Sequence, residues 1–433
     1  MSLVPQIVAY PESAQILRRQ VAATVLLSTR WAVLAMVPVL LRVHFGADNF
    51  QTLVATVAGP ALMSLSIFWG HLYHRLQPER FLWLLWSVAM LPIAGIALCH
   101  TANTALVFVV LAAVGSSGMI PVTGDILRGC YSPSLRGRVW GLLNVASLAS
   151  ITAVAYVVGF WLDRNGEAFR IYMPLAVIVQ AAGVAILVGI TRQPLFIERQ
   201  RAREPVEPAG ELLGPLSQLW RTLRTDKHFL RYELAFMSYG VGWMICAALL
   251  PVLVTDKLHL SYTDVAESTQ VALQLTMLLT TLPMGYLVDR LGPARMCAAA
   301  FAWLAIYPIG LLLAQGAASL TVVTIAYALG MAAMNMGWML GPVMLAREAA
   351  QAPTYIAIHS SLVGLRALFG QPLGMGLYVL SGGFTLPFGL AAATFALGAW
   401  GMYLLHRQLR SAAAHQPQPP STGPGTAPTT TVT

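Results

Sequence analysis

Long apolar blocks separated by short polar connections run along most of the chain. A helix that crosses the hydrocarbon core of a bilayer needs about 20 mainly apolar residues. Twelve blocks reach that length, six on either side of a polar stretch at about 191–227. We expect membrane spans near residues 21–43, 51–74, 81–99, 104–128, 139–162, 171–190, 229–254, 265–287, 295–315, 319–346, 355–379 and 384–405. The pattern therefore predicts an all-α membrane protein whose 12 transmembrane helices form two six-helix bundles.

The polar stretch also sets the predicted domain boundaries. Residues 1–190 form an N-terminal six-helix bundle, 191–227 a cytoplasmic linker, 228–408 a C-terminal six-helix bundle and 409–433 a disordered tail rich in Pro, Thr and Gly. Apolar side chains recur at helical spacing late in the linker, at Leu212, Leu213, Leu216, Leu219, Trp220 and Leu223, with Arg221 and Arg224 between them. This pattern favours a helix lying in the cytoplasmic membrane interface, and an ordinary soluble linker helix is the alternative.

Charged residues are scarce and unevenly placed. They make up 10% of the chain, against 57% hydrophobic residues, whereas a soluble domain carries roughly 25% charged residues. The net charge of +9 forms no basic stripe, so nucleic acid is not an expected partner. Arginines gather in every second connection, which places both termini in the cytoplasm by the positive-inside rule. On the other side, neighbouring charges are expected to balance locally: Asp163, Arg164, Glu167 and Arg170 with one another, and Asp256 with Lys257.

The chain lacks the usual sequence signatures of enzymes and metal sites. Its four cysteines form no CxxC pair, and GxxxxGK[ST], HExxH and GxSxG do not occur. We therefore predict no catalytic residues, no cofactor, no bound metal and no ATP hydrolysis. The expected surroundings are the lipid bilayer of a bacterial inner membrane. We expect a monomer, and a protein partner is the open alternative.

One sequence motif occurs twice, once at the end of span two and once at the end of span eight. The later copy reads Gly285-Tyr-Leu-Val-Asp289-Arg290-Leu-Gly292-Pro-Ala-Arg295. The earlier copy keeps Gly70, Leu72, Arg75 and Arg80 at identical offsets, but has His74 for the Asp and Gln77 for the second Gly. The later copy resembles the GxLxDRxGxxR signature of the major facilitator superfamily. A repeat at equivalent places in two halves is typical of transporters built from duplicated bundles.

This resemblance implies a cytoplasmic gate. The first glycine of each copy would let two helices approach closely. The Asp289 carboxylate would accept from backbone N–H groups at the start of a neighbouring helix, and Arg290 would reach Glu348 at the end of span ten. With neutral His74, the first-half gate should be weaker or pH-sensitive. Span five lacks the Gly-Pro signature of drug/proton antiporters, and span eleven carries a partial version, Gly370-Gln371-Pro372-Leu373-Gly374.

Two charged residues lie inside the first set of spans. Arg30 is about nine residues into span one, which is roughly 13 Å at 1.5 Å per residue, and Asp125 lies inside span four. Charges at this depth normally face a cavity or a partner. By analogy with the family, spans one, four, seven and ten line a central cavity, so Arg30 and Asp125 could form a switchable pair. The alternatives are that Asp125 pairs with Arg75 or Arg138 in the cytoplasmic gate, or that both charges are static.

Further polar residues provide candidates for binding solute or protons. The candidates in the second half are Glu233, Tyr239, Trp243, Asn335, Trp338 and Arg366, the last with His359 two turns earlier. Methionines in span ten could bind a soft metal ion, but their spread around the helix favours packing: Met331, Met334, Met336, Met339 and Met344. Glycines in spans four and ten should allow close helix approach: Gly115, Gly118, Gly129, Gly330, Gly337 and Gly341. Pro121 and Pro342 are expected to interrupt these two helices.

These features favour a secondary transporter that moves a small solute by alternating access, coupled to a gradient such as that of protons. A deep arginine favours an anionic or zwitterionic solute, and iron or copper is a less favoured variant. The alternative is a transport-inactive protein of the same fold, which would serve as an assembly factor or sensor for another membrane system.

Overall fold

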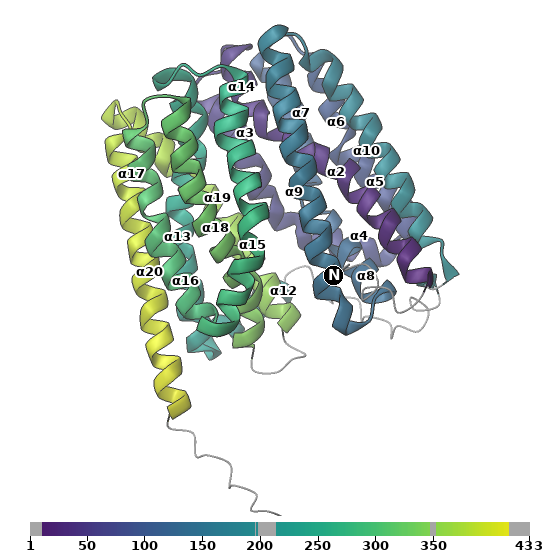
Figure 1. The fold of residues 1–433 in the computed structure, drawn as a ribbon, viewed down its shortest axis with the longest axis vertical. Helices are drawn as coiled ribbons and strands as arrows, with labels where there is room; N and C mark the ends of the chain where they lie inside the picture. The colour runs from purple at the N-terminus through teal and green to yellow at the C-terminus, as the bar shows by residue number, and fades with distance from the viewer. Residues whose placement is uncertain (1–10, 195, 198–213, 347–351, 415–433) are drawn as a thin grey trace, which may run out of the picture.

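The computed structural model describes residues 11–194, 196–197, 214–346 and 352–414, and helices joined by short turns make up almost all of this part (Figure 1). Each predicted span coincides with one helix or with a run of consecutive helices. In the first half these are α2 (Pro11–Val43), α3 (Asn49–Leu62) with the 3-10 turn η1 (Met63–Leu65) and α4 (Ser66–Arg75), α5 (Pro78–Ala89) with α6 (Leu91–Ile96), α7 (Ala102–Val114) with α8 (Met119–Cys130), α9 (Pro133–Arg164) and α10 (Phe169–Thr191).

The second half repeats this arrangement after α12 (Gly214–Thr225). Its helices are α13 (Lys227–Val252) with the π-helical turn η2 (Leu253–Lys257), α14 (Tyr262–Val265) with η3 (Ala266–Val271) and α15 (Ala272–Leu291), α16 (Pro293–Leu304) with α17 (Ile306–Leu313), α18 (Ala317–Leu345), α19 (Ala352–Ser381) and α20 (Thr385–Ala414). Within the described residues, ten helices are long and apolar enough to cross a membrane. The segments 49–75 and 352–381 complete the predicted twelve but fall outside those ten.

Local sequence signals set where these helices begin. The side chains of Asp48 and Ser261 each accept a hydrogen bond from a backbone N–H of the first turn, at the starts of α3 and α14. In return, the side chain of the residue three positions later accepts a hydrogen bond from the backbone N–H of the cap residue, which completes a capping box. A proline occupies the first turn of α5, α9 and α16, where its missing N–H has no helical partner to lose.

The helices before the linker pack mainly on one another, as do those after it (Figure 1). In the first group α2 lies against α9 and α10, and in the second α13 lies against α19 and α20. The two groups meet where α3 contacts α19 and where α9 contacts α14, η3 and α15. The chain enters α2 and leaves α20 at the same end of the molecule, the lower end in Figure 1. This common end agrees with the predicted even number of spans.

Close helix approach at glycines is confirmed at five of the six predicted positions. A side chain at Gly115 or Gly118 would collide with α5, at Gly330 or Gly337 with α16, and at Gly341 with Tyr232 of α13. At Gly129 the nearest atom would be an ordinary 3.5 Å away. The predicted proline breaks were wrong in detail. The break in span four lies at residues 115–118 instead of Pro121, and α18 continues past Pro342 to Leu345.

The linker forms a helix over the part that the structure describes. In α12, Leu219 and Leu223 pack against the core while Trp220 is exposed, with the Arg224 guanidinium 4.5 Å from its ring centroid. The predicted helical positions Leu212 and Leu213 and the tail 415–433 lie outside the described residues. The interfacial position of this helix and the domain boundaries stay predictions.

Candidate functional site

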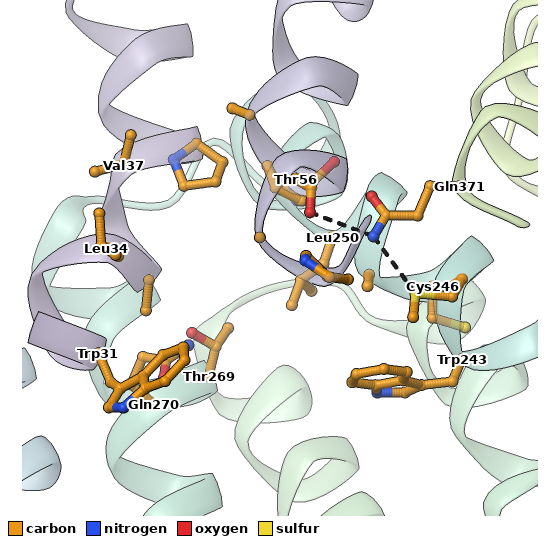
Figure 2. Close-up of a pocket in the computed structure, with 18 of the residues that line it drawn as sticks. Trp31, Leu34, Val37, Thr56, Trp243, Cys246, Leu250, Thr269, Gln270 and Gln371 are labelled. Atoms are coloured by element: carbon orange, nitrogen blue, oxygen red, sulfur yellow. Dashed lines mark hydrogen bonds between the residues drawn. The ribbon is translucent and has the colours of Figure 1, made fainter. Parts of the chain in front are cut away.

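A cavity of about 400 Å³ lies between the two groups of helices. Its walls come from α2, α3 and α7 on one side and from α13, η3, α15, α17, α18 and α19 on the other. Trp31 and Trp243 stand on opposite walls (Figure 2). The polar side chains include Arg30, Thr269, Gln270 and Gln371, and no acidic residue of the described part of the chain lines the cavity. The volume suits a small organic solute.

Arg30 supplies the only charge on this wall within the described residues. It is 5% exposed, and its Nη2 donates to the Ala112 carbonyl of α7 at 2.9 Å. Its Nε is buried without a hydrogen-bond partner. Arg30 also lines a second cavity of about 240 Å³ within the first group of helices, together with Ser28, Asn144 and Ser147. A deep arginine with a free donor between two cavities is suited to bind an anionic group.

Gln371 provides an unpaired acceptor in the same cavity. Its Nε2 donates to the Thr56 carbonyl of α3 at 3.3 Å and contacts Met244 Sδ at 3.5 Å, while its buried Oε1 accepts no hydrogen bond (Figure 2). The flanking glycines explain this placement, because a Cβ at Gly370 or Gly374 would lie 2.9 Å from α13 atoms. The partial motif in span eleven therefore packs α19 on α13 and directs Gln371 into the cavity. Gln371 was not among the predicted site residues.

Trp243 forms the wall between the cavity and a buried arginine. Its Nε1 donates to the Tyr327 hydroxyl at 2.6 Å, and the Arg366 guanidinium lies 5.7 Å from its ring centroid. Arg366 is 4% exposed and donates from Nη1 to the Phe236 carbonyl at 3.2 Å. A Cβ at Gly240 would collide with the Arg366 side chain. These contacts join α19 to α13 through Arg366.

Glu233 is paired with a histidine that the site prediction did not include. His359 Nδ1 lies 2.9 Å from Glu233 Oε1 and 3.0 Å from Oε2, and each residue is 2% exposed. The pair joins α13 to α19 but lines neither cavity. The sequence held a weak signal for it, because His359 precedes Arg366 by two helical turns and Glu233 precedes Gly240 by the same interval.

The structure does not bring Arg30 and Asp125 together. Arg30 binds the Ala112 carbonyl, and Asp125 lies thirteen residues further along α7 and α8, or about 20 Å at helical rise. The Asp125 carboxylate instead accepts from the Tyr73 hydroxyl of α4 at 2.9 Å. Tyr73 is part of the first motif copy, so Asp125 lies with the predicted cytoplasmic gate, near the place that the alternative interpretation gave it.

The other predicted residues surround the arginine and the histidine without lining the larger cavity. Tyr239 stacks on Phe301 at 4.3 Å and donates to Met331 Sδ at 3.5 Å. The Trp338 ring lies 5.6 Å from the His359 ring, and Asn335 is half-buried. Within the described residues, no group of three His, Cys, Asp or Glu side chains could hold a metal ion.

The repeated motif lies at the end of the molecule where the chain enters α2 and leaves α20. Gly292 has φ +75°, a conformation that favours glycine, where it ends α15 and begins α16. Gln77 at the equivalent place has φ −61°, so the first copy makes a different turn. Arg290 hydrogen-bonds Tyr286 of its own helix, and Arg75, Arg80 and Arg295 are exposed. Glu348 and the side chains of His74 and Asp289 lie outside the described residues.

The expected close packing at the first glycine of each motif copy is not found among the described residues. No described atom lies within 4 Å of the place where a Cβ would stand on Gly70 or Gly285. The main described contacts between the two groups of helices involve α3 and η1 with α19, and α9 with α14, η3 and α15. The gating role of the motif stays a prediction, because the side chains of Asp289 and His74 and all of Glu348 lie outside the described residues.

Besides the Gln371–Thr56 hydrogen bond in the cavity, several polar contacts cross between the two groups at the opposite, predicted periplasmic end. The Arg42 guanidinium of α2 pairs with Asp256 and donates to Thr255 at 3.1 Å. Asp163, at the end of α9, accepts the backbone N–H groups of Tyr262 and Thr263 at 2.8 Å each. These N–H groups begin α14, where the helix dipole favours an anion. This is the same kind of contact that the sequence predicted for Asp289, and the prediction for Asp289 itself stays untested because its side chain lies outside the described residues.

The charges expected to balance at this end cancel in number, but only some of them contact their sequence neighbours. Asp163 and Asp256 bind across the helix groups, and Lys257 donates to the Leu312 carbonyl at 2.7 Å. Glu167 pairs with Arg170 of the same connection. The hydrogen bond from Arg170 holds the pKa of the Glu167 carboxyl below its usual range.

The fold and cavity define a multi-pass helical membrane protein with a solute-sized chamber between two groups of helices. A family model described as Major Facilitator Superfamily matches residues 20–273. A comparison with curated protein sequences found no match. Among solved structures, a peptide transporter POT in complex with sulfate has a TM-score of 0.67 at 14% identity, covering 94% of this chain and 95% of its own.

Two further structures extend this likeness. The human organic anion transporter MFSD10 (TETRAN) has a TM-score of 0.63 at 15% identity, covering 92% of this chain and 100% of its own. A POT family transporter in complex with 5-aminolevulinic acid has a TM-score of 0.67 at 11% identity, covering 94% and 97%. The chain belongs to the Major Facilitator Superfamily, as its repeated motif predicted. It is a membrane transporter and not an enzyme.

Proposed function

We propose that this transporter carries a small organic solute with an anionic group, by alternating access, across a bacterial inner membrane. The observation that carries the proposal is the cavity between the helix groups, with an unpaired Arg30 donor and an unpaired Gln371 acceptor on its walls. A buried polar group without a partner costs about 1–3 kcal/mol. A solute that satisfies both groups gains this free energy on binding.

The charge and shape of the cavity narrow the class of solute. A cationic solute would meet Arg30 with no acidic side chain of the described part of the chain to offset the repulsion. The aromatic rings of Trp31 and Trp243 offer apolar walls for the body of the solute. The class is therefore an amphipathic anion or zwitterion whose carboxylate binds Arg30 and whose hydrogen-bond donor reaches Gln371. Anionic ligands also occur in the similar structures, which hold sulfate and 5-aminolevulinic acid.

Alternating access is supported by where the cross-group contacts lie. Arg42, Asp256 and Asp163 join the helix groups at the predicted periplasmic end. The glycines of the repeated motif lie at the other end and have room for a neighbouring helix. In the proposed cycle the periplasmic contacts break as the motif ends close, so the cavity faces each side in turn. The candidate gate residues at the motif ends belong to this proposal.

A thermal-shift screen of the purified protein, at two pH values, tests the binding step. The panel contains monocarboxylates, amino acids, sulfate, iron and copper, with benzoate as the reference anion. We expect organic anions to raise the melting temperature of the wild type but not of Arg30→Gln. Arg221→Gln is the matched control, because Arg221 is exposed on α12, far from the cavity in sequence. Stabilisation by cations alone would overturn the proposed solute class.

Flux into liposomes tests transport itself. Uptake of a stabilising anion, lost in Arg30→Gln and kept in Arg221→Gln, is the expected result. If the protein moved no member of the panel yet co-purified stably with another membrane protein, the transport-inactive assembly factor or sensor would be the better assignment.

A further inference from the structure

The Glu233–His359 pair is the one buried acid–base pair among the described residues. Both residues are 2% exposed, and His359 Nε2 is buried without a hydrogen-bond partner. A static structural pair would be expected to use both imidazole nitrogens, because a buried unpaired polar atom costs free energy. The pair can therefore accept one further proton at this nitrogen without breaking its hydrogen bond.

The neighbouring titratable groups are already engaged or lie elsewhere. On α13, the Tyr232 hydroxyl donates to the Gly337 carbonyl and Tyr239 donates to Met331. On α19, Tyr355 donates to Asp226. Cys297 of α16 and Tyr327 of α18 are buried, and Tyr327 accepts from Trp243.

No titratable residue occurs in α3 or η1, and those of α20 lie in its last turns, from residue 403 onward. The group that remains to act on the pair is Arg366. It lies two turns beyond His359 on the same helix. No carboxylate of the described residues lies within ion-pairing distance of Arg366. When His359 is neutral, the charges of Glu233 and Arg366 cancel, so Glu233, His359 and Arg366 together carry no net charge. One added proton gives the three side chains a net charge of +1.

Trp243 connects this cluster to the solute cavity. Its side chain lines the cavity, and the Arg366 guanidinium, which does not line it, lies 5.7 Å from the ring centroid. A solute that contacts Trp243 is therefore separated from Arg366 by this one side chain. Because both sites lie in a medium of low dielectric, charge in one is felt in the other.

We infer that Glu233 and His359 form the proton-binding site of this transporter, and that Arg366 links its occupancy to that of the cavity. The inference rests on the proposed function for the identity of the solute, but not for the existence of the proton site. The proton adds to the Glu233 carboxylate or to the free His359 nitrogen, and no other bond changes. An added positive charge and a bound anion stabilise each other, so proton and solute travel in the same direction. The coupling is reciprocal: each raises the affinity of the other by the same factor.

The decisive experiment needs no solute. Infrared difference spectra of the full-length protein in lipid bilayers are recorded as the pH is varied, and carboxyl and imidazole bands report protonation. We expect a titrating pair in the wild type that is absent in Glu233→Gln and in His359→Gln. Glu167→Gln is the matched control, since its partner Arg170 lies at the periplasmic end. An unchanged titration in correctly folded Glu233→Gln would overturn the proton site.

Adding benzoate tests the link to the cavity. Benzoate should raise the proton affinity of the pair about tenfold in the wild type, within the usual range of allosteric coupling, and leave it unchanged in Arg366→Gln. A titrating pair that ignores benzoate, in a protein that benzoate stabilises against heat, would overturn the role of Arg366. If no organic anion stabilises the protein, the proposed function fails, while the solute-free titration still decides the proton site.

Discussion

Asp163 offers a direct test of how the periplasmic end is held closed. Its carboxylate accepts two backbone N–H groups at the start of α14, across the boundary between the helix groups. Hydrogen bonds to a charged group contribute about 1.5–3 kcal/mol when buried. Because Asp163 is exposed to solvent, we assign both hydrogen bonds together a contribution of about 1.4 kcal/mol to the stability of the closed periplasmic end. Asp163→Ala should then raise the ratio of open to closed periplasmic ends about tenfold.

Spin labels measure this shift. Phe50, near the start of α3, is 71% exposed, and Leu313, the last residue of α17, is 69% exposed. The two helices belong to different groups, and both residues lie at this end. The four native cysteines are buried, which favours labelling at introduced cysteines. Pulsed electron resonance on labels at positions 50 and 313 should show a growing population of longer distances in Asp163→Ala. Asp163→Asn should give a smaller shift, because an amide oxygen can still accept.

Glu167→Ala is the control for the loss of one negative charge. Glu167 lies four residues after Asp163, but its ion pair with Arg170 stays within one helix group. We expect its distance distribution to match the wild type. Identical distributions for Asp163→Ala and the wild type would refute the reasoning, as would an equal shift in Glu167→Ala.

Two further predictions concern glycines. Gly398→Ala should lower the melting temperature by the equivalent of about 1–3 kcal/mol of overpacking, since its Cβ would lie 2.9 Å from the Ala235 carbonyl and 3.0 Å from the Tyr239 nitrogen. Gly389→Ala on the same helix is the control, because a Cβ there would meet open space, and its melting temperature should equal or exceed that of the wild type. An equal fall in melting temperature for both variants would contradict the packing argument. Gly292→Ala should destabilise the protein by about 1–2 kcal/mol, because Gly292 has a positive φ. Gln77→Ala is the control and should change the melting temperature little, because Gln77 has φ −61°. A Gly292→Ala protein that melts like the wild type would contradict this prediction.

The sequence by itself determined the elements and their order. Each predicted span coincides with described helices, because the transfer of a residue into hydrocarbon depends mainly on that residue and its near neighbours. The motif at Gly285 identified the family on the same local basis, since its loop glycine is needed by the backbone at that position. The depth of Arg30 also followed from counting along one helix.

Only the tertiary structure decided which of these residues meet. Arg30 binds a carbonyl 82 positions away, and His359 pairs with a glutamate 126 positions away. These partners depend on how each helix is rotated and how closely it packs, which glycines such as Gly370 set through contacts with distant helices. The same dependence brought the Asp163 carboxylate to the start of α14 in the other helix group and directed Gln371 into the cavity. Hydropathy along a chain carries no information on helix rotation between bundles, so these pairings could not be read from the sequence.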